Sequence, residues 1–234
     1  ESLFEHGRKV QAERDAPLAE RMRPSTFDEF VGQNQIVDPD RVLLRSIAAG
    51  RLPSIILWGP PGTGKTTLAR LVASSTQSDF QSVSAVTSGV ADLRRIVAEA
   101  RDRKGMHQQS TILFVDEIHR FNKAQQDVIL PHVEDGTVTF IGATTENPSF
   151  EVIAPLLSRC RVFALQSLDP DQMASIVNRA LADQMRGLGP LNATLAEDAM
   201  AHLVNIANGD ARIALNALET AAYAFTPDAD GKRA

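Results

Sequence analysis

The stretch SIILWGPPGTGKTT at residues 54–67 decides the fold of this chain. Its first part, residues 54–58, is an apolar run of strand length, and residues 59–66 fit the phosphate-loop pattern G-x-x-x-x-G-K-[ST]. Glycines let successive backbone N–H groups curl around an anion, and the N-terminus of a following helix adds positive potential. The stretch therefore predicts a strand, a phosphate-binding loop and a helix over residues 65–75.

The residues of this loop have expected roles. Lys65 is expected to reach the β- and γ-phosphates of a nucleotide, and the Thr66 hydroxyl is expected to bind Mg²⁺. The residues expected to contact ATP are Gly59, Pro60, Pro61, Gly62, Thr63, Gly64, Lys65, Thr66 and Thr67.

An acidic pair follows another apolar run, ILFV at residues 112–115. Asp116 and Glu117 come directly after this run, and ligands of open α/β sheets bind at the carboxyl ends of strands. Asp116 is expected to hold Mg²⁺, and Glu117 is expected to activate a water aimed at the γ-phosphate. A P-loop kinase does not need such a glutamate, so the pair favours hydrolysis of ATP over phosphate transfer.

The pattern around these motifs alternates between strands and helices. A helix is expected to begin at Asp38-Pro39 and to stop at Gly50, and Asn122 is expected to cap a later one. Strands separated by helices predict an α/β fold with a parallel five-stranded sheet. The expected strands are residues 54–58, 80–84, 111–115, 137–143 and 161–165, and the expected helices among them are residues 65–75, 90–103 and 122–133.

Beyond residue 165 the strand signals end. An apolar stripe over residues 170–184 predicts one helix, Thr194 and Glu197 have the spacing of a capping box for a second, and residues 210–225 predict a third. These helices predict a C-terminal all-α lid. The expected division of the chain is a mobile arm at 1–16, an ATPase core at 17–167, the lid at 168–225 and a frayed tail at 226–234.

Composition excludes several classes of protein. The 234 residues carry a net charge of −5, which disfavours a strongly cationic nucleic-acid binder. Cys160 is the sole cysteine, so an intrachain disulfide is excluded and a reducing compartment is favoured. The apolar runs are far shorter than the ~20 residues of a membrane-spanning helix. The chain begins with Glu1, which we interpret as a trimmed N-terminus, and we expect a cytoplasmic, nucleoid-associated protein.

Several longer strings resemble the clamp-loader clade of AAA+ ATPases. They are RPSTFDEFVGQ at 23–33, the two nucleotide motifs above, GATTENPSF at 142–150 and LSRC at 157–160. The strings HRFNKAQQD and GATTENPSF, together with AVTSGV at 85–90, limit the resemblance to one family of this clade. They resemble the replication-associated recombination protein A family, the bacterial relatives of the Werner-helicase-interacting ATPase. The resemblance covers residues 17–225.

This resemblance implies further roles. Thr145 would be the sensor 1 residue that helps to position the attacking water, with Thr144 as the competing choice. Arg159 would be an arginine finger that reaches into the ATP site of a neighbouring subunit. Arg212 would be the sensor 2 residue at the γ-phosphate. The residues that would flank the adenine are Val31, Gly32 and Ile36.

The resemblance also implies action on DNA at stalled or gapped replication forks, with single-strand-binding protein as a candidate partner. It implies a homo-oligomer that depends on a region beyond the lid, so assembly is expected to be weakened in a chain that ends at Ala234. Three alternatives stay open: a clamp-loader-type subunit, a P-loop kinase, and a nucleotide switch that does not hydrolyse ATP. We interpret the basic clusters as solvated helix faces, and His119 and His132 as structural or solvated. The clusters are Arg94/Arg95, Arg101/Arg103/Lys104 and Arg120/Lys123.

Overall fold

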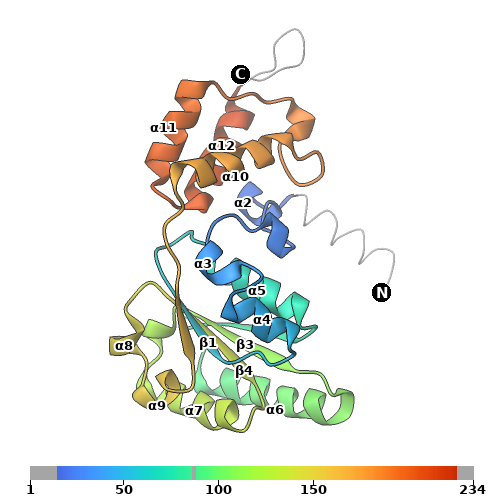
Figure 1. The fold of residues 1–234 in the computed structure, drawn as a ribbon, viewed down its shortest axis with the longest axis vertical. Helices are drawn as coiled ribbons and strands as arrows, with labels where there is room; N and C mark the ends of the chain where they lie inside the picture. Colours follow the sequence, from blue (N-terminus) through green and yellow to red (C-terminus); the bar gives the residue numbers. More distant parts are fainter. Residues whose placement is uncertain (1–14, 86–87, 226–234) are drawn as a thin grey trace. The chain divides into compact units, whose positions relative to one another are not determined.

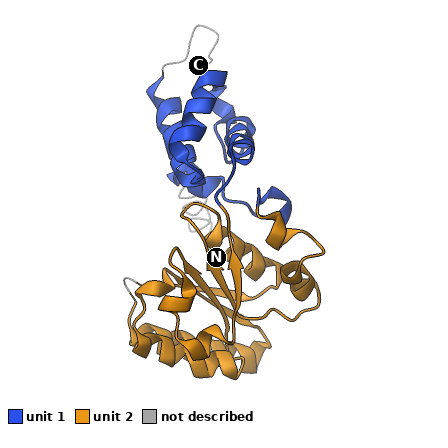
Figure 2. Ribbon diagram, turned by 60° about the vertical axis from the view of Figure 1, so that its left-hand side comes forward, with its two compact units in different colours: residues 1–32, 167–234 blue, residues 33–166 orange. Residues whose placement is uncertain are grey.

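A computed structural model describes residues 15–85 and 88–225 (Figure 1). The expected tail at 226–234 and nearly all of the expected arm at 1–16 lie outside these residues. The chain divides into two compact units (Figure 2): residues 33–166 form an α/β unit, and residues up to 32 join residues from 167 onward in a helical unit. None of the described helices is long and apolar enough to span a membrane.

Five parallel strands make up the sheet of the α/β unit, in the order β2-β3-β4-β1-β5. This confirms the expected parallel five-stranded sheet. Strand β1 lies between β4 and β5, so that Ile55 is paired with Ile141 on one side and Arg161 on the other. The strands are β1 (Ile55–Trp58), β2 (Asp79–Ser84), β3 (Thr111–Asp116), β4 (Thr139–Thr144) and β5 (Arg161–Ala164).

Helices lie on both faces of this sheet (Figure 1). Helix α5 (Lys65–Ser75) contacts β2, β3 and β4. Helices α6 (Val90–His107) and α7 (Lys123–Glu134) pack on the other face, where Leu93 and Ile129 join a fully buried core. Because both faces are covered, the central strands are continuously apolar rather than alternating. The short elements of the unit are α3 (Asn34–Val37), α4 (Val42–Ala48), α8 (Pro148–Glu151), α9 (Ala154–Leu157) and the 3-10 turn η2 (Ile118–Arg120).

The helical unit has a separate hydrophobic core. Met173 and Val177 on α10 pack there with Leu215 and Leu218 on α12. The elements are α2 (Leu18–Arg21), η1 (Phe27–Glu29), α10 (Pro170–Ala182), η3 (Gly189–Leu191), α11 (Glu197–Ala207) and α12 (Ala211–Ala224).

Three expectations differ from the structure. Residues 17–32 were expected in the core, but Leu18 and Met22 are buried in the hydrophobic cluster of the helical unit, so the chain enters the α/β unit only at Gln33. Asp38 follows α3 in an extended conformation instead of capping a helix, and α4 starts later, at Val42. The expected capping box at Thr194 is also wrong, because α11 begins at Glu197 without a side-chain cap.

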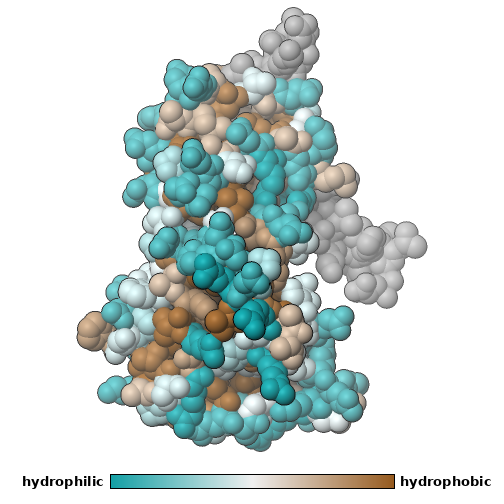
Figure 3. All heavy atoms as spheres, in the orientation of Figure 1, coloured by the Kyte–Doolittle hydropathy of each residue, from teal (hydrophilic) through white to brown (hydrophobic). Residues whose placement is uncertain are grey.

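The face shown in Figure 3 is largely polar, with apolar side chains between the polar ones. In the α/β unit the most exposed large apolar side chains are Phe150 and Met106. The helical unit has a larger number of exposed large apolar side chains. Several of these lie on α11, on α12 or at the end of α12. They are Met185, Ile206, Ile213, Tyr223 and Phe225.

Candidate functional site

The phosphate loop begins where β1 leaves the middle of the sheet. The backbone N–H of Gly59 donates a hydrogen bond to the Thr144 carbonyl oxygen of β4 (3.1 Å), and the Leu165 N–H donates to the Trp58 carbonyl oxygen (2.7 Å). A Cβ atom at Gly59 would lie only 2.4 Å from the Leu165 carbonyl oxygen. The first position of the loop therefore accepts only glycine.

The bend of the loop also depends on glycine. Gly62 and Gly64 have φ values of 70° and 94°, in the left-handed region that other residues rarely adopt. Gly64 is the N-terminal flanking residue of α5, an 11-residue helix, so the loop leads directly into a helix N-terminus. This is the strand–loop–helix context that the sequence motif requires.

Lys65 lies against the loop that precedes it. Its side chain is buried, and its Nζ donates hydrogen bonds of 2.7 Å to the carbonyl oxygens of both Gly59 and Pro60. The Thr63 hydroxyl donates to the same Pro60 oxygen (2.9 Å). Thr66 and Thr67 follow on the first turn of α5. Lys65 and Thr66 are thus the first two residues of one helix.

The acidic pair lies at the end of strand β3, which is separated from β1 by β4. Asp116 is the last residue of that strand. Glu117 has left-handed backbone angles (φ 55°, ψ 48°), which are uncommon for a residue with a side chain. The chain turns there into η2, whose Ile118 is fully buried and anchors the turn in the core. Asp116 and Glu117 consequently leave the strand in different directions.

His119 lies between Glu117 and strand β4 and contacts both through its two ring nitrogens. The Nε2 of His119 lies 3.1 Å from Glu117 Oε2, and the Nδ1 lies 3.0 Å from the hydroxyl oxygen of Thr144. Thr144 is fully buried and also accepts a hydrogen bond from the Glu146 N–H (3.0 Å). Sequence reasoning missed the role of His119, because the histidine has no second metal ligand at a recognisable spacing.

The two candidate sensor 1 residues occupy different places. Thr144 ends β4 and contacts His119, whereas Thr145 lies just beyond the strand. Among the described residues, the Thr145 hydroxyl has no hydrogen bond. The sensor 1 role of Thr145 stays a prediction, and Thr144 is the residue linked to Glu117.

Arg159 lies just after the short helix α9 and is bound within its own chain. It forms an ion pair with Glu134 of α7 and donates a hydrogen bond to the Pro155 carbonyl oxygen (2.7 Å), yet its side chain is still 42% exposed. Burial raises the pKa of the neighbouring Cys160 thiol to about 12. The buried Gln126 holds the preceding segment, donating to the Glu151 carbonyl oxygen (2.9 Å) and accepting from the Ile153 N–H (2.9 Å).

The residues expected at the adenine belong to different units. Val31 and Gly32 lie in the helical unit, and Ile36 lies buried on α3 of the α/β unit. Gly32 has φ 78°, and a Cβ atom there would lie 3.0 Å from both Gln172 and Leu168, so glycine is required. The adenine-side roles therefore stay predictions.

Gln33, the first residue of the α/β unit, holds the two chain segments at which that unit begins and ends. Its side-chain amide donates to the Gln166 carbonyl oxygen (2.7 Å) and accepts from the Gln166 N–H (2.9 Å). The side chain thus makes the two hydrogen bonds that a neighbouring strand would make.

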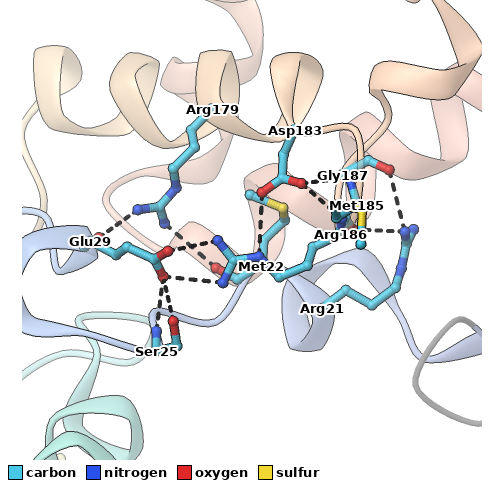
Figure 4. A network of polar contacts seen from close by, with 9 residues as sticks. All are labelled: Arg21, Met22, Ser25, Glu29, Arg179, Asp183, Met185, Arg186 and Gly187. Carbon is cyan, nitrogen blue, oxygen red and sulfur yellow. Dashed lines mark hydrogen bonds and ion pairs between the residues drawn. The ribbon is translucent and has the colours of Figure 1, made fainter. Parts of the chain in front are cut away.

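A polar network ties the N-terminal segment to the rest of the helical unit (Figure 4). Glu29 forms a two-pronged ion pair with Arg186 (2.8 and 3.1 Å) and accepts a hydrogen bond from the Ser25 N–H (2.9 Å). These contacts lower the pKa of Glu29 from 4.5 to about 2, chiefly through the hydrogen bonds from Arg186. Arg179 donates to the Glu29 carbonyl oxygen, and burial lowers the pKa of Arg179.

Arg212, the expected sensor 2 residue, lies on the first turn of α12. Its guanidinium contacts the carboxylate of Asp210 (3.1 and 3.3 Å), the residue that caps this helix, and its side chain is 63% exposed. Its position is thus fixed at a helix start while the side chain stays accessible. Its contact with a γ-phosphate stays a prediction.

The basic clusters differ in how far they are neutralised. On α6, Arg95 pairs with Glu99 (2.7 Å) and Arg103 with Asp79 (2.9 Å). By contrast, Arg120 and Lys123 are exposed and have no ion pair among the described residues.

The site fits the triphosphate of a nucleotide together with a divalent cation. Gly62 and Gly64 bend the loop through positive φ values, and the loop leads into a helix N-terminus, which favours anions. The described residues contain no group of three or more His, Cys, Asp or Glu side chains that could enclose a metal. Mg²⁺ typically takes one or two protein oxygens and completes its coordination with phosphates and waters.

Comparison with known proteins agrees with this geometry. Residues 22–153 match the family described as the Holliday junction DNA helicase RuvB P-loop domain. The chain is 49% identical over 217 residues to replication-associated recombination protein A of Escherichia coli K12, covering 93% of this chain and 48% of that protein. It is 52% identical to the protein of the same name from Coxiella burnetii, over 87% of this chain and 46% of that one.

A eukaryotic relative and a solved structure extend the comparison. The chain is 45% identical to ATPase WRNIP1 of Dictyostelium discoideum, over 88% of this chain and 23% of that protein. The Thermotoga maritima RuvB Holliday junction branch migration motor superposes with a TM-score of 0.69 at 28% identity, covering 85% of this chain and 64% of that one. The chain thus spans about half the length of the bacterial relatives named above.

Proposed function

The chain belongs to the replication-associated recombination protein A family of AAA+ ATPases and carries a RuvB-type P-loop domain, and on this premise we propose that it is the ATP-hydrolysing module of a protein that acts on DNA at stalled or gapped replication forks. The observation that carries the proposal is the site in the α/β unit. There a glycine loop with Lys65 follows β1, and Asp116 ends β3 and is followed directly by Glu117.

The loop binds the triphosphate of ATP. Backbone N–H groups between Gly59 and Thr66 donate to phosphate oxygens, and the start of α5 adds positive potential. Lys65 donates to the β- and γ-phosphates in exchange for its present carbonyl partners. Thr66 and Asp116 hold Mg²⁺, which neutralises charge on the phosphates when bound.

Hydrolysis depends on Glu117. Its carboxylate accepts a proton from a water that attacks the γ-phosphorus atom, and the bond from that atom to the β–γ bridging oxygen breaks. Thr145, or Thr144 in its place, orients the water. The backbone of Glu117 is fixed relative to the sheet, because Glu117 follows the last residue of a buried strand.

Arg159 completes the site of a neighbouring copy in a homo-oligomer. Guanidinium groups suit the charge that develops on the phosphoryl oxygens in the transition state. Arg159 would exchange its own Glu134 for that position. The exposed apolar side chains of the helical unit are available for assembly.

The helical unit acts as the lid of this ATPase. Arg212 contacts the γ-phosphate, and Val31, Gly32 and Ile36 flank the adenine. Because segment 18–32 is bound to α10 and α12, a change in the position of the lid would move Val31 and Gly32 with it.

DNA is the proposed partner because two relatives are named for replication-associated recombination and the structural neighbour for Holliday junction branch migration. Contacts to DNA phosphates would depend strongly on salt concentration. Arg120 and Lys123 are the first candidates for such contacts, since both are exposed and neither pairs with an acid among the described residues. Single-strand-binding protein is a candidate partner, and nucleoid association would follow from DNA binding.

Of the alternatives, a P-loop kinase finds no support in the family of this chain. A clamp-loader-type subunit shares the same site, and it differs in the partner that the ATPase cycle moves. A nucleotide switch that binds ATP without hydrolysing it is distinguished by turnover alone.

The test is steady-state phosphate release by the full-length protein, with and without forked DNA. We expect hydrolysis that requires Mg²⁺ and rises in the presence of forked DNA. Arg120→Glu should reduce the response to DNA and leave the DNA-independent rate unchanged, with Arg51→Glu, an exposed arginine outside the site, as the control. Phosphate release that does not respond to any DNA would contradict the DNA part of the proposal, and absent turnover would favour a switch.

A further inference from the structure

We propose that His119 is a positioning residue for ATP hydrolysis: it orients the carboxylate of Glu117 and is itself held by the buried hydroxyl of Thr144. This inference rests on the proposed function, because it concerns the glutamate that activates water there. It assigns a role to a histidine that sequence reasoning took to be structural or solvated.

The backbone at Glu117 makes the contact with His119 possible. Strand β3 ends at Asp116, and Glu117 then takes left-handed angles that let η2 begin immediately. The Arg120 N–H donates to the Glu117 carbonyl oxygen (2.8 Å), which closes the turn. Residues with side chains adopt this conformation at a cost and often at functional sites. The turn brings the side chains at positions 117 and 119 together.

The two ring nitrogens of His119 face different partners. Because a carboxylate only accepts, the 3.1 Å contact between His119 Nε2 and Glu117 Oε2 is favourable when Nε2 carries a proton. The other ring nitrogen faces Thr144, whose side chain is fully buried at the end of β4. The Nδ1 edge of the ring is therefore held by the sheet, and the Nε2 edge reaches the carboxylate.

The side chains of Glu117 and His119 differ in their exposure to solvent. The Glu117 side chain is 36% exposed, as a group that must meet water and nucleotide has to be, whereas His119 is only 14% exposed. An accessible carboxylate without a fixed neighbour would sample several rotamers. A small misplacement of a reacting group can reduce a rate about 100-fold. His119 restricts Glu117 to the orientation set by strands β3 and β4.

Two substitutions separate positioning from simple packing. In His119→Gln the amide nitrogen falls near the place of Nε2 and can donate to Glu117, while the contact with Thr144 is lost. In His119→Asn the side chain reaches Thr144 but not Glu117. If His119 positions Glu117, Gln restores more activity than Asn; if His119 only packs against β4, Asn restores at least as much as Gln.

The experiment measures kcat and KM for ATP hydrolysis by the full-length protein. We expect His119→Ala to reduce kcat roughly 10- to 100-fold, with KM and ATP affinity changed less than threefold. His132→Ala is the matched control, since His132 is also largely buried and also lies near a carboxylate, that of Asp135, outside the site. An unchanged kcat in His119→Ala, or better rescue by Asn than by Gln, overturns the proposal.

A second readout does not depend on turnover. The imidazole nitrogens of ¹⁵N-labelled protein, assigned by their loss in His119→Ala, should shift when Glu117→Gln or Thr144→Val is introduced. Unaltered signals in both variants also overturn the proposal. If Glu117→Gln retains full hydrolysis, the proposed function fails instead; if Glu117→Gln abolishes hydrolysis and His119→Ala does not reduce it, the role of His119 alone fails.

Discussion

The charged side chains of the candidate site in the α/β unit and those of the polar network in the helical unit serve different purposes. In the α/β unit, Lys65 begins helix α5 and donates to backbone oxygens of the loop, and Glu117 follows strand β3 and contacts His119. In the helical unit, Glu29 and Arg186 pair with one another across more than 150 residues of chain. Charges of the first kind are available to a ligand, while those of the second kind hold a segment in place.

The difference predicts separate consequences of mutation. Removing a charge from the α/β site should change binding or catalysis with little loss of stability. Removing one from the network of the helical unit should lower its stability, because the partner is left with an unmatched charge.

The largest expected effect concerns Arg159. In an assembled protein, Arg159→Ala should reduce hydrolysis about 1000-fold, as is typical for an arginine finger. Mixing it with Glu117→Gln protein should restore part of the activity, because some interfaces then combine an intact Glu117 with an intact Arg159. Arg161→Ala, an exposed arginine two residues away, is the control and should keep normal turnover. No recovery on mixing would argue against action in a neighbouring subunit.

The next effect is on nucleotide binding. Lys65→Ala should weaken ATP binding roughly 100-fold, because charge-assisted hydrogen bonds to phosphate are lost. Titration calorimetry measures this affinity, with Lys123→Ala as a control that removes an exposed lysine. Equal affinities of the wild type and Lys65→Ala would refute the assignment of the loop.

A smaller effect is expected in the helical unit. Glu29→Gln should lower the free energy of unfolding by about 1–2 kcal/mol, since the ion pair with Arg186 becomes a weaker contact and leaves a charge unmatched. Denaturant unfolding measures the loss. Asp28→Asn removes an exposed charge from the same turn and should change the stability by less than about 0.5 kcal/mol. Similar losses in both variants would mean that the network does not hold segment 18–32.

The smallest effect is a pH dependence of the same network. The pKa of Glu29 is lowered to about 2 in the folded protein from an ordinary value of 4.5. Its stabilisation is therefore complete above pH 4.5 and is lost as the pH falls from 4.5 to about 2. Acid unfolding curves should show a steeper loss for the wild type than for Glu29→Gln in this window. Parallel curves would contradict the pairing.

The local motifs of the α/β unit could be predicted from the sequence. The phosphate loop and the acidic pair are local: strand, glycines and Lys65 lie within a dozen residues, and the structure has the expected strand–loop–helix arrangement. The five-stranded parallel sheet was predictable for a similar reason, because buried strands read as short apolar runs.

Long-range contacts were not predictable in the same way. Leu18 and Met22 belong to the helical unit because they pack beside residues more than 140 positions away, and no local pattern indicates this. His119 was missed because its role depends on the left-handed turn at Glu117 and on Thr144 of another strand. Asp38-Pro39 failed as a helix start because the turn at Asp38 leads into α4 only at Val42.

The most direct test compares ATP binding with ATP cleavage in Glu117→Gln under single-turnover conditions. Rapid quenching after mixing with radiolabelled ATP and Mg²⁺ measures cleavage, and filter binding of the same samples measures bound nucleotide. We expect wild-type affinity for ATP and a cleavage rate reduced about 10²- to 10⁴-fold, as for the loss of a general base. Cleavage at the wild-type rate, or loss of ATP binding, would contradict a site in which Glu117 activates water.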